Sequence, residues 1–164
     1  FYIHEYDADG NWKRSFGGPG SGDGKFDTPH GVWIDRRPGR QQAIIVCDRA
    51  HNTLQYLSMD GQYQETLTGY GLPANIDTWQ DLIVIPELKA RLTLLNAKNE
   101  VVARLGDDVA RVTAKEGGAI RGDKNKWTAG KFVHPHDACF GHDGSIFVAE
   151  WVGTGRVSKL KRLG

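Results

Sequence analysis

Short apolar runs alternate with polar turns along the chain, and three stretches repeat the same order of runs. The three stretches are residues 26–67, 71–106 and 132–163. Each contains an early proline, a short run, a turn, a strongly β-branched run ("AIIVCD", "DLIVIP" or "SIFVAE") and a further apolar run. The first two stretches add a fourth run, "YQETL" or "VVARL". β-Branched runs bounded by turns predict strands, and no helical period competes with them.

Four strands repeated at roughly 40 to 45 residues are typical of a β-propeller blade. We therefore expect an all-β fold in which residues 1–164 form a partial propeller. Residues 26–67 and 71–106 are predicted to form one blade each, and residues 132–163 a last blade without its fourth strand. Residues 1–17 match only the outer half of a blade. The prediction is roughly three blades plus that half-blade.

Propellers close into rings of about four to eight blades, so this set leaves sheet edges unpaired. The expected partners are the missing blades, either on the same longer chain or on another subunit. Because the sequence begins in the middle of a blade, we favour the longer chain.

Residues 107–131 break the repeat as an inserted loop. They carry six Lys and Arg residues against four Asp and Glu residues. Long connections in compact domains are usually functional or disordered. Two interpretations stay open: a solvated loop, or a flap over one mouth of the propeller that is anchored by Trp127.

The composition argues only against partners that would need a strongly charged protein surface. The formal net charge of +1 gives no strong attraction to nucleic acid or to an anionic membrane. No apolar run approaches the roughly 20 residues that span a bilayer, so a membrane partner is not expected. Cys47 and Cys139 both lie in apolar surroundings, which predicts two buried free thiols.

The most specific candidate site is a histidine that follows the proline of the first and third stretches. His30 and His136 occupy this position, and Ala74 occupies it in the middle stretch. The first strand of a blade is innermost, so both imidazoles are expected near the central channel, where they could bind a metal ion. Two histidines are one ligand short of the three that catalytic zinc usually takes. The alternative is a capping role, with each imidazole bonded to a loop carbonyl.

Other polar residues near these positions are weaker candidates. Asp137 follows His136 and could orient an imidazole or contact a substrate. Arg49 follows the second strand and could bind a carboxylate, although an Asp48–Arg49 turn that ties neighbouring blades is an equal alternative. His134 is expected to be a bystander. The remaining histidines are His51 and His142, which are expected in solvated turns, and His4, which is given no role.

The stretches "GKFDTPHGVWID", "IIVCDRAHNTLQ" and "GKFVHPHDACFGHDGSIFVAEW" carry a family resemblance. The chain resembles the NHL-repeat β-propellers outside the inserted loop, and within them the lyase domain of peptidylglycine α-amidating enzymes. This resemblance implies a propeller of six blades when complete. It implies that His30 and His136 ligate zinc, and that Arg49 and Asp137 are active-site residues.

The resemblance also implies an activity and a location. The lyase cleaves a peptidyl-α-hydroxyglycine into a peptide amide and glyoxylate, and secretion or a periplasmic location would follow. Calcium is the alternative ion. The family's third zinc histidine and catalytic tyrosine would lie upstream of Phe1, and His134 stands where the lyase has a methionine.

Three functions stay open from the sequence. The first is the metal-dependent lyase, and the second is a non-catalytic propeller that binds a protein, a peptide or a small-molecule ligand. The third is RNA binding through a basic face. Trp127 is the only aromatic residue of the basic loop, whereas base stacking needs several aromatic side chains, so nucleic acid comes last.

Overall fold

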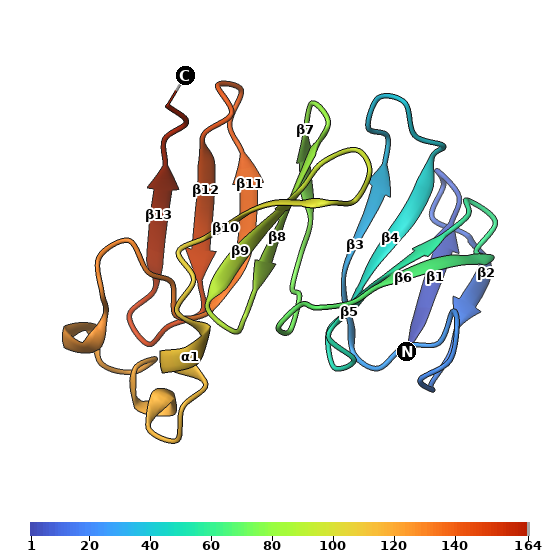
Figure 1. The fold of residues 1–164 in the computed structure, drawn as a ribbon. Helices are drawn as coiled ribbons and strands as arrows, with labels where there is room; N and C mark the ends of the chain where they lie inside the picture. The colour runs from blue at the N-terminus through green and yellow to red at the C-terminus, as the bar shows by residue number, and fades with distance from the viewer. Residues whose placement is uncertain (164) are drawn as a thin grey trace.

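A computed structural model describes residues 1–163, and its strands form four antiparallel sheets in chain order (Figure 1). The first sheet pairs β1 (Tyr2–Tyr6) with β2 (Trp12–Gly17). The second contains β3 (Pro29–Asp35), β4 (Ala43–Asp48), β5 (Thr53–Leu57) and β6 (Tyr63–Leu67). The third contains β7 (Asp77–Trp79), β8 (Leu82–Glu87), β9 (Arg91–Leu95) and β10 (Val101–Leu105). The fourth contains β11 (Pro135–Phe140), β12 (Ile146–Glu150) and β13 (Arg156–Leu160).

The expected all-β architecture with four-stranded antiparallel sheets is confirmed. The sequence predicts first strands at "GVWID", "ANIDT" and "DACFG", and all three differ in their bounds from the structure, where the first begins earlier, at Pro29. The middle sheet begins at Asp77 rather than at Ala74, and only an isolated bridge joins Pro73 to Glu87. The last sheet begins at Pro135, before the predicted Asp137.

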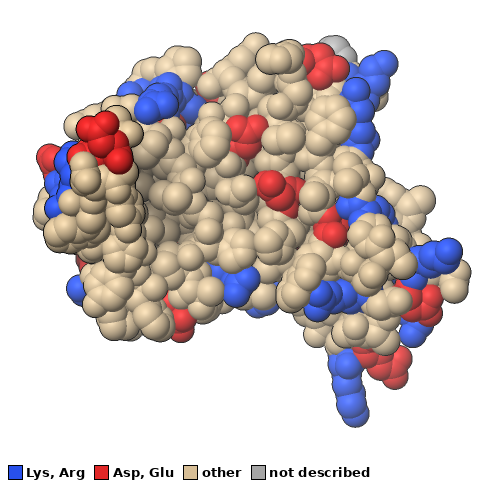
Figure 2. All heavy atoms as spheres, turned by 180° about the vertical axis from the view of Figure 1, so that it is seen from behind, with Lys and Arg blue, Asp and Glu red and all other residues tan. Residues whose placement is uncertain are grey.

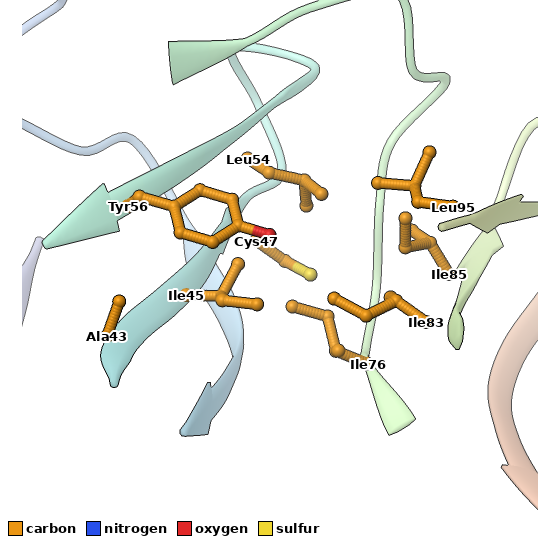
Figure 3. Packing of buried hydrophobic residues seen from close by; sticks show 9 residues of the cluster. All are labelled: Ala43, Ile45, Cys47, Leu54, Tyr56, Ile76, Ile83, Ile85 and Leu95. Atoms are coloured by element: carbon orange, nitrogen blue, oxygen red, sulfur yellow. The ribbon is translucent and has the colours of Figure 1, made fainter. Parts of the chain in front are cut away.

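Apolar side chains between neighbouring sheets form the core. The largest buried cluster joins the second and third sheets, with Ile45, Leu54 and Tyr56 facing Ile83 and Ile85 (Figure 3). A second cluster joins the third and fourth sheets, and a third cluster joins the first and second. The central strands β4 and β8 are buried almost throughout because sheets cover both of their faces. Burial between sheets therefore explains their continuous β-branched runs.

The last sheet leaves one face uncovered among the described residues. In β12, buried and exposed residues alternate, and Phe147 and Ala149 lie on the exposed side. Val157 of β13 is 76% exposed. Cys139 belongs to the same face and is exposed, so the prediction of two buried thiols holds for Cys47 alone. Both thiols are free, and burial raises the pKa of Cys47.

A buried acid at the end of each second strand fixes the loop that precedes the first strand. Asp48 Oδ1 accepts a bond of 2.8 Å from Asp27 N, and Glu150 Oε1 accepts one of 2.7 Å from Val133 N. Glu87 accepts the corresponding bond from Gly71 N. Because a histidine follows a few residues later in two of the sheets, these bonds also position the candidate site.

Residues 107–131 contain the short helix α1 (Val109–Val112) and two 3-10 turns, Gly117–Ala119 and Lys124–Lys126. Val112 and Ile120 are buried with Val133 and Val152 of the last sheet's loops. Trp127 packs against this cluster and donates from Nε1 to Ile120 O at 2.9 Å. The segment is thus not a wholly solvated loop. Within residues 1–163, no helix is long and apolar enough to cross a membrane.

Candidate functional site

His30 and His136 lie beside one another, although they come from different sheets. His30 is the second residue of β3, and His136 is the second residue of β11. Their ring centroids are 4.9 Å apart, and the rings meet edge to face at 75°. The structure therefore brings together the two histidines that the repeat position predicts near the channel.

A backbone carbonyl fixes the orientation of the His30 ring. His30 Nδ1 donates to Ala74 O at 2.6 Å, which requires the proton on Nδ1. In the neutral ring, Nε2 then carries a lone pair and has no hydrogen-bond partner among residues 1–163. The bond matches the predicted capping role. It is also the arrangement by which proteins orient a metal-ligating histidine.

Local electrostatics favour a neutral His136. Partial burial lowers the pKa of His136, and the neighbouring His30 and Arg49 lower it further. Asp137 acts in the opposite direction, but its effect on the pKa is smaller. A neutral imidazole keeps a lone pair at neutral pH, as metal ligation or proton transfer requires.

Arg49 contributes an uncommitted cation to the same region. Its side chain is partly buried, and within residues 1–163 its guanidinium makes neither a hydrogen bond nor an ion pair. Asp48, the other residue of the predicted Asp48–Arg49 turn, is buried and fully engaged. That carboxylate accepts from Asp27 N in the loop before β3, and it also bonds His51 in the turn after β4 and Gln55 in β5.

The middle stretch lacks a histidine at this repeat position, but it bonds His30 on one side and Asp137, the neighbour of His136, on the other. Asn75 Nδ2 donates to Asp137 Oδ1 at 2.7 Å, and the preceding residue, Ala74, accepts the bond from His30. Asp137 is exposed and uses Oδ1 again for Ala138 N, at 2.8 Å. Sequence reasoning missed Asn75, although it occupies the repeat position of Asp137.

Gly31 allows this close approach between β3 and the loop before β7. A Cβ atom at Gly31 would lie 2.7 Å from both Ala74 O and Asn75 Cα. Any larger residue would push these backbone segments apart. The bond from His30 to Ala74 therefore depends on the absence of a side chain at the next residue.

The other histidines are placed outside the pair. His134 Nδ1 donates to Leu88 O at 2.6 Å, which fits the predicted bystander. His51 bonds Asp48 Oδ2 at 2.7 Å and is half-buried, so its prediction as a solvated residue is wrong. His142 is exposed, and His4 bonds Ser15 Oγ at 2.7 Å.

Trp151 is a further residue at this site that sequence reasoning passed over. It follows Glu150 as Arg49 follows Asp48, so the two hold equivalent positions in the repeat. Its ring centroid lies 6.1 Å from that of His136. The guanidinium of Arg121, from the inserted segment, stacks 3.4 Å from the Trp151 centroid. The repeat position was the available signal.

The described residues fit a metal ion only in part. Across residues 1–163, no group of three or more His, Cys, Asp or Glu side chains is arranged to hold an ion. The imidazole pair suits zinc by ligand type, and the carbonyl bond of His30 leaves the required nitrogen available. One or more further ligands would be needed to complete a catalytic zinc site.

No family model and no curated protein sequence matches the chain. Solved structures do. Virginiamycin B lyase from Staphylococcus aureus matches with a TM-score of 0.57 and 12% identity, covering 99% of this chain and 49% of that one. A catalytically inactive variant of this lyase with quinupristin matches with a TM-score of 0.59 and 14% identity, again covering 99% of this chain and 49% of that one. A streptogramin B lyase matches with a TM-score of 0.55 and 16% identity, covering 98% of this chain and 58% of that one.

The chain has a β-propeller fold. At these identities the likeness shows the fold alone. The chain spans about half the length of the virginiamycin B lyase structures that it matches. The comparisons therefore confirm the β-propeller fold that the repeat predicts.

Proposed function

We propose that this propeller is a metal-dependent lyase and that the chain supplies part of its active site. The proposed substrate is of the peptidyl-α-hydroxyglycine type, cleaved into a peptide amide and glyoxylate. The observation that carries the proposal is the convergence of His30 and His136, whose ring centroids are 4.9 Å apart, near the uncommitted cation of Arg49. The fold is shared with solved lyases, including one inactivated by replacing a single histidine with alanine.

His30 and His136 would hold the ion, each through a ring nitrogen that no other described residue binds. Zinc is the proposed ion because imidazole suits it, whereas calcium prefers oxygen ligands. When bound, such an ion polarises a substrate oxygen and favours its deprotonation. The remaining ligand is proposed to come from the other half of the propeller, since the chain spans about half of the matched lyase structures.

The chain's own side chains would bind and orient the substrate. Arg49 would bind the substrate carboxylate by donating a pair of N–H···O bonds to it. Asp137, held by Asn75, would present its free Oδ2 to the substrate beside His136. In the reaction the hydroxyl group loses its proton, the carbon–nitrogen bond breaks, and the amide nitrogen gains a proton, so the products balance the substrate. A base outside the described residues is proposed to take the hydroxyl proton.

The test is release of glyoxylate from α-hydroxyhippurate by the full-length protein in the presence of zinc. We expect release by the wild type, loss of release in His136→Ala, and unchanged release in His142→Ala, the exposed control. A wild-type protein that releases no glyoxylate would refute the lyase proposal. Equal release by His136→Ala would refute the assigned site.

Failure of that assay together with ligand binding would favour the alternative, a non-catalytic propeller that binds a peptide or small molecule. Nucleic acid is a weaker alternative. On the face shown in Figure 2, Lys and Arg side chains are scattered among Asp and Glu and form no continuous basic surface over the described residues.

A further inference from the structure

We propose that Trp151, backed by Arg121, forms a subsite for a planar aromatic group on an anionic ligand. The subsite lies next to His136, on the strand-to-strand turn that follows β12. The inference rests on the proposed function in one respect, which is that the reacting end of the ligand lies at the histidine pair.

The repeat places Trp151 at the site. Each second strand ends in a buried acid, and the next residue donates its N–H to the loop before the first strand. These bonds run from Arg49 to Thr28 O at 3.3 Å and from Trp151 to His134 O at 2.8 Å. The fold thus holds Trp151 as it holds Arg49. Arg49 lies close enough to His136 for its charge to lower the pKa of that histidine. An aromatic ring stands on the last sheet where a cation stands on the second.

The inserted segment fixes the Trp151 ring. Arg121 Nε donates to Trp151 O at 3.0 Å, and Gly153 N donates to Arg121 O at 3.0 Å. The guanidinium of Arg121 stacks on the ring, and the adjacent Ile120 is buried in the apolar cluster of the segment. Trp151 therefore loses little additional freedom when a ligand binds. The inserted segment acts as a support for the subsite.

Trp151 nevertheless keeps an accessible surface. It is 54% exposed although Arg121 covers one of its faces. An open hollow of about 350 Å³ is lined by His136, Ala149, Glu150 and Trp151. This volume lies within the usual range for small-molecule sites, about 300 to 1,000 Å³. An aromatic group can stack on an indole ring that is held in this way.

Two unpaired cations near the hollow, Arg49 and Arg121, favour an anionic ligand against the opposing charge of the exposed Asp137 carboxylate. Arg49 and Arg121 make no ion pair with any carboxylate of residues 1–163. The Glu150 carboxylate that lies closest in sequence is buried and bound by Val133 N and Arg156. An aromatic N-acylglycine combines the two required features, a carboxylate and a planar ring.

The experiment compares three N-acylglycines that share the carboxylate and the amide. Hippurate carries a phenyl ring, cyclohexanecarbonylglycine a saturated ring of similar size, and N-acetylglycine a methyl group. We expect calorimetry on the full-length protein to give roughly tenfold tighter binding for hippurate than for N-acetylglycine, as one stacked ring supplies. The saturated ring should fall between them.

Substitutions assign the discrimination to the subsite. Trp151→Ala should make hippurate and N-acetylglycine bind equally, Trp151→Phe should retain most of the preference, and Arg121→Gln should weaken it. Trp12→Ala is the matched control, because Trp12 is 60% exposed on the first sheet. If Trp151→Ala does not fold, Trp151→Phe and Arg121→Gln carry the test.

The outcomes separate this inference from the proposed function. Equal binding of hippurate and N-acetylglycine by the wild type, or a preference that survives in Trp151→Ala, would overturn the subsite. A preference for hippurate that depends on Trp151, without glyoxylate release from α-hydroxyhippurate, would support the subsite and refute the lyase.

Discussion

The two ends of strand β3 place polar side chains in opposite circumstances. At one end, the side chains of Asp35 and Arg37 are fully buried as an ion pair of 2.8 Å. Arg37 also donates to Asn96 O and to Asn99 in the next sheet. At the other end, His30 is exposed, and only one of its two ring nitrogens has a partner among the described residues.

The difference separates a structural clamp from a candidate site. All three guanidinium nitrogens of Arg37 donate hydrogen bonds, to Asp35 beside it and to Asn96 and Asn99 of the next sheet's turn, so little capacity is left for a ligand. Such buried networks fix a unique packing when all of their members are satisfied. The histidine end instead keeps lone pairs and the unpaired cation of Arg49 at the surface. Because water can solvate these unpaired groups, leaving them without protein partners costs little stability. They are therefore available to bind a ligand.

The largest expected effect comes from breaking the clamp. Arg37→Ala should lower the free energy of unfolding by about 3–5 kcal/mol, because it leaves buried Asp35 with fewer partners. Urea denaturation measures this change. Arg36→Ala, at the exposed neighbouring residue, should change the free energy by less than about 0.5 kcal/mol. Similar effects of the two substitutions would contradict the comparison.

A smaller effect is expected from the acid that positions the histidine end. Asp48→Asn should lower the free energy of unfolding by about 2 kcal/mol, because it removes charged acceptors for Asp27 N and His51. Thermal and urea unfolding measure the change. Asp60→Asn, whose side chain is 84% exposed, is the control. If Asp48→Asn proved as mild as Asp60→Asn, the acid would not anchor the sheet.

The smallest effect on stability is expected from protonation of His136 in the His30–His136 pair. The pKa of His136, followed by NMR, should lie below its ordinary value of 6.5 and should rise in His30→Ala and in Arg49→Gln. Because the folded pKa is lowered, the unfolded chain takes up the proton first as the pH falls. Stability contributed at His136 should therefore fall as the pH drops from 6.5 through the folded pKa. A His136 pKa above 6.5 would contradict this account.

The sequence predicted the repeat and, through it, the meeting of His30 and His136. Both follow a proline at the start of an innermost strand, and this local pattern needs no knowledge of the loops. The clamp was not predictable, because Arg37 finds Asn96 and Asn99 only after two sheets have packed.

The aromatic side of the site was missed for a similar reason. The contact between Arg121 and Trp151 depends on the path of the inserted segment, which has no counterpart in the repeat. The exposure of Cys139 likewise depends on which face of the last sheet is covered. Local sequence determines the blade, whereas contacts between separate segments determine these features.

Titration of zinc into the full-length protein, followed through the imidazole NMR signals, tests the proposed metal site most directly. The account predicts that the signals of His30 and His136 change together and saturably, while those of exposed His142 stay unchanged. His30→Ala and His136→Ala should each weaken zinc binding by at least roughly tenfold. Zinc binding that neither substitution weakens, or no change in either signal at millimolar zinc, would contradict it.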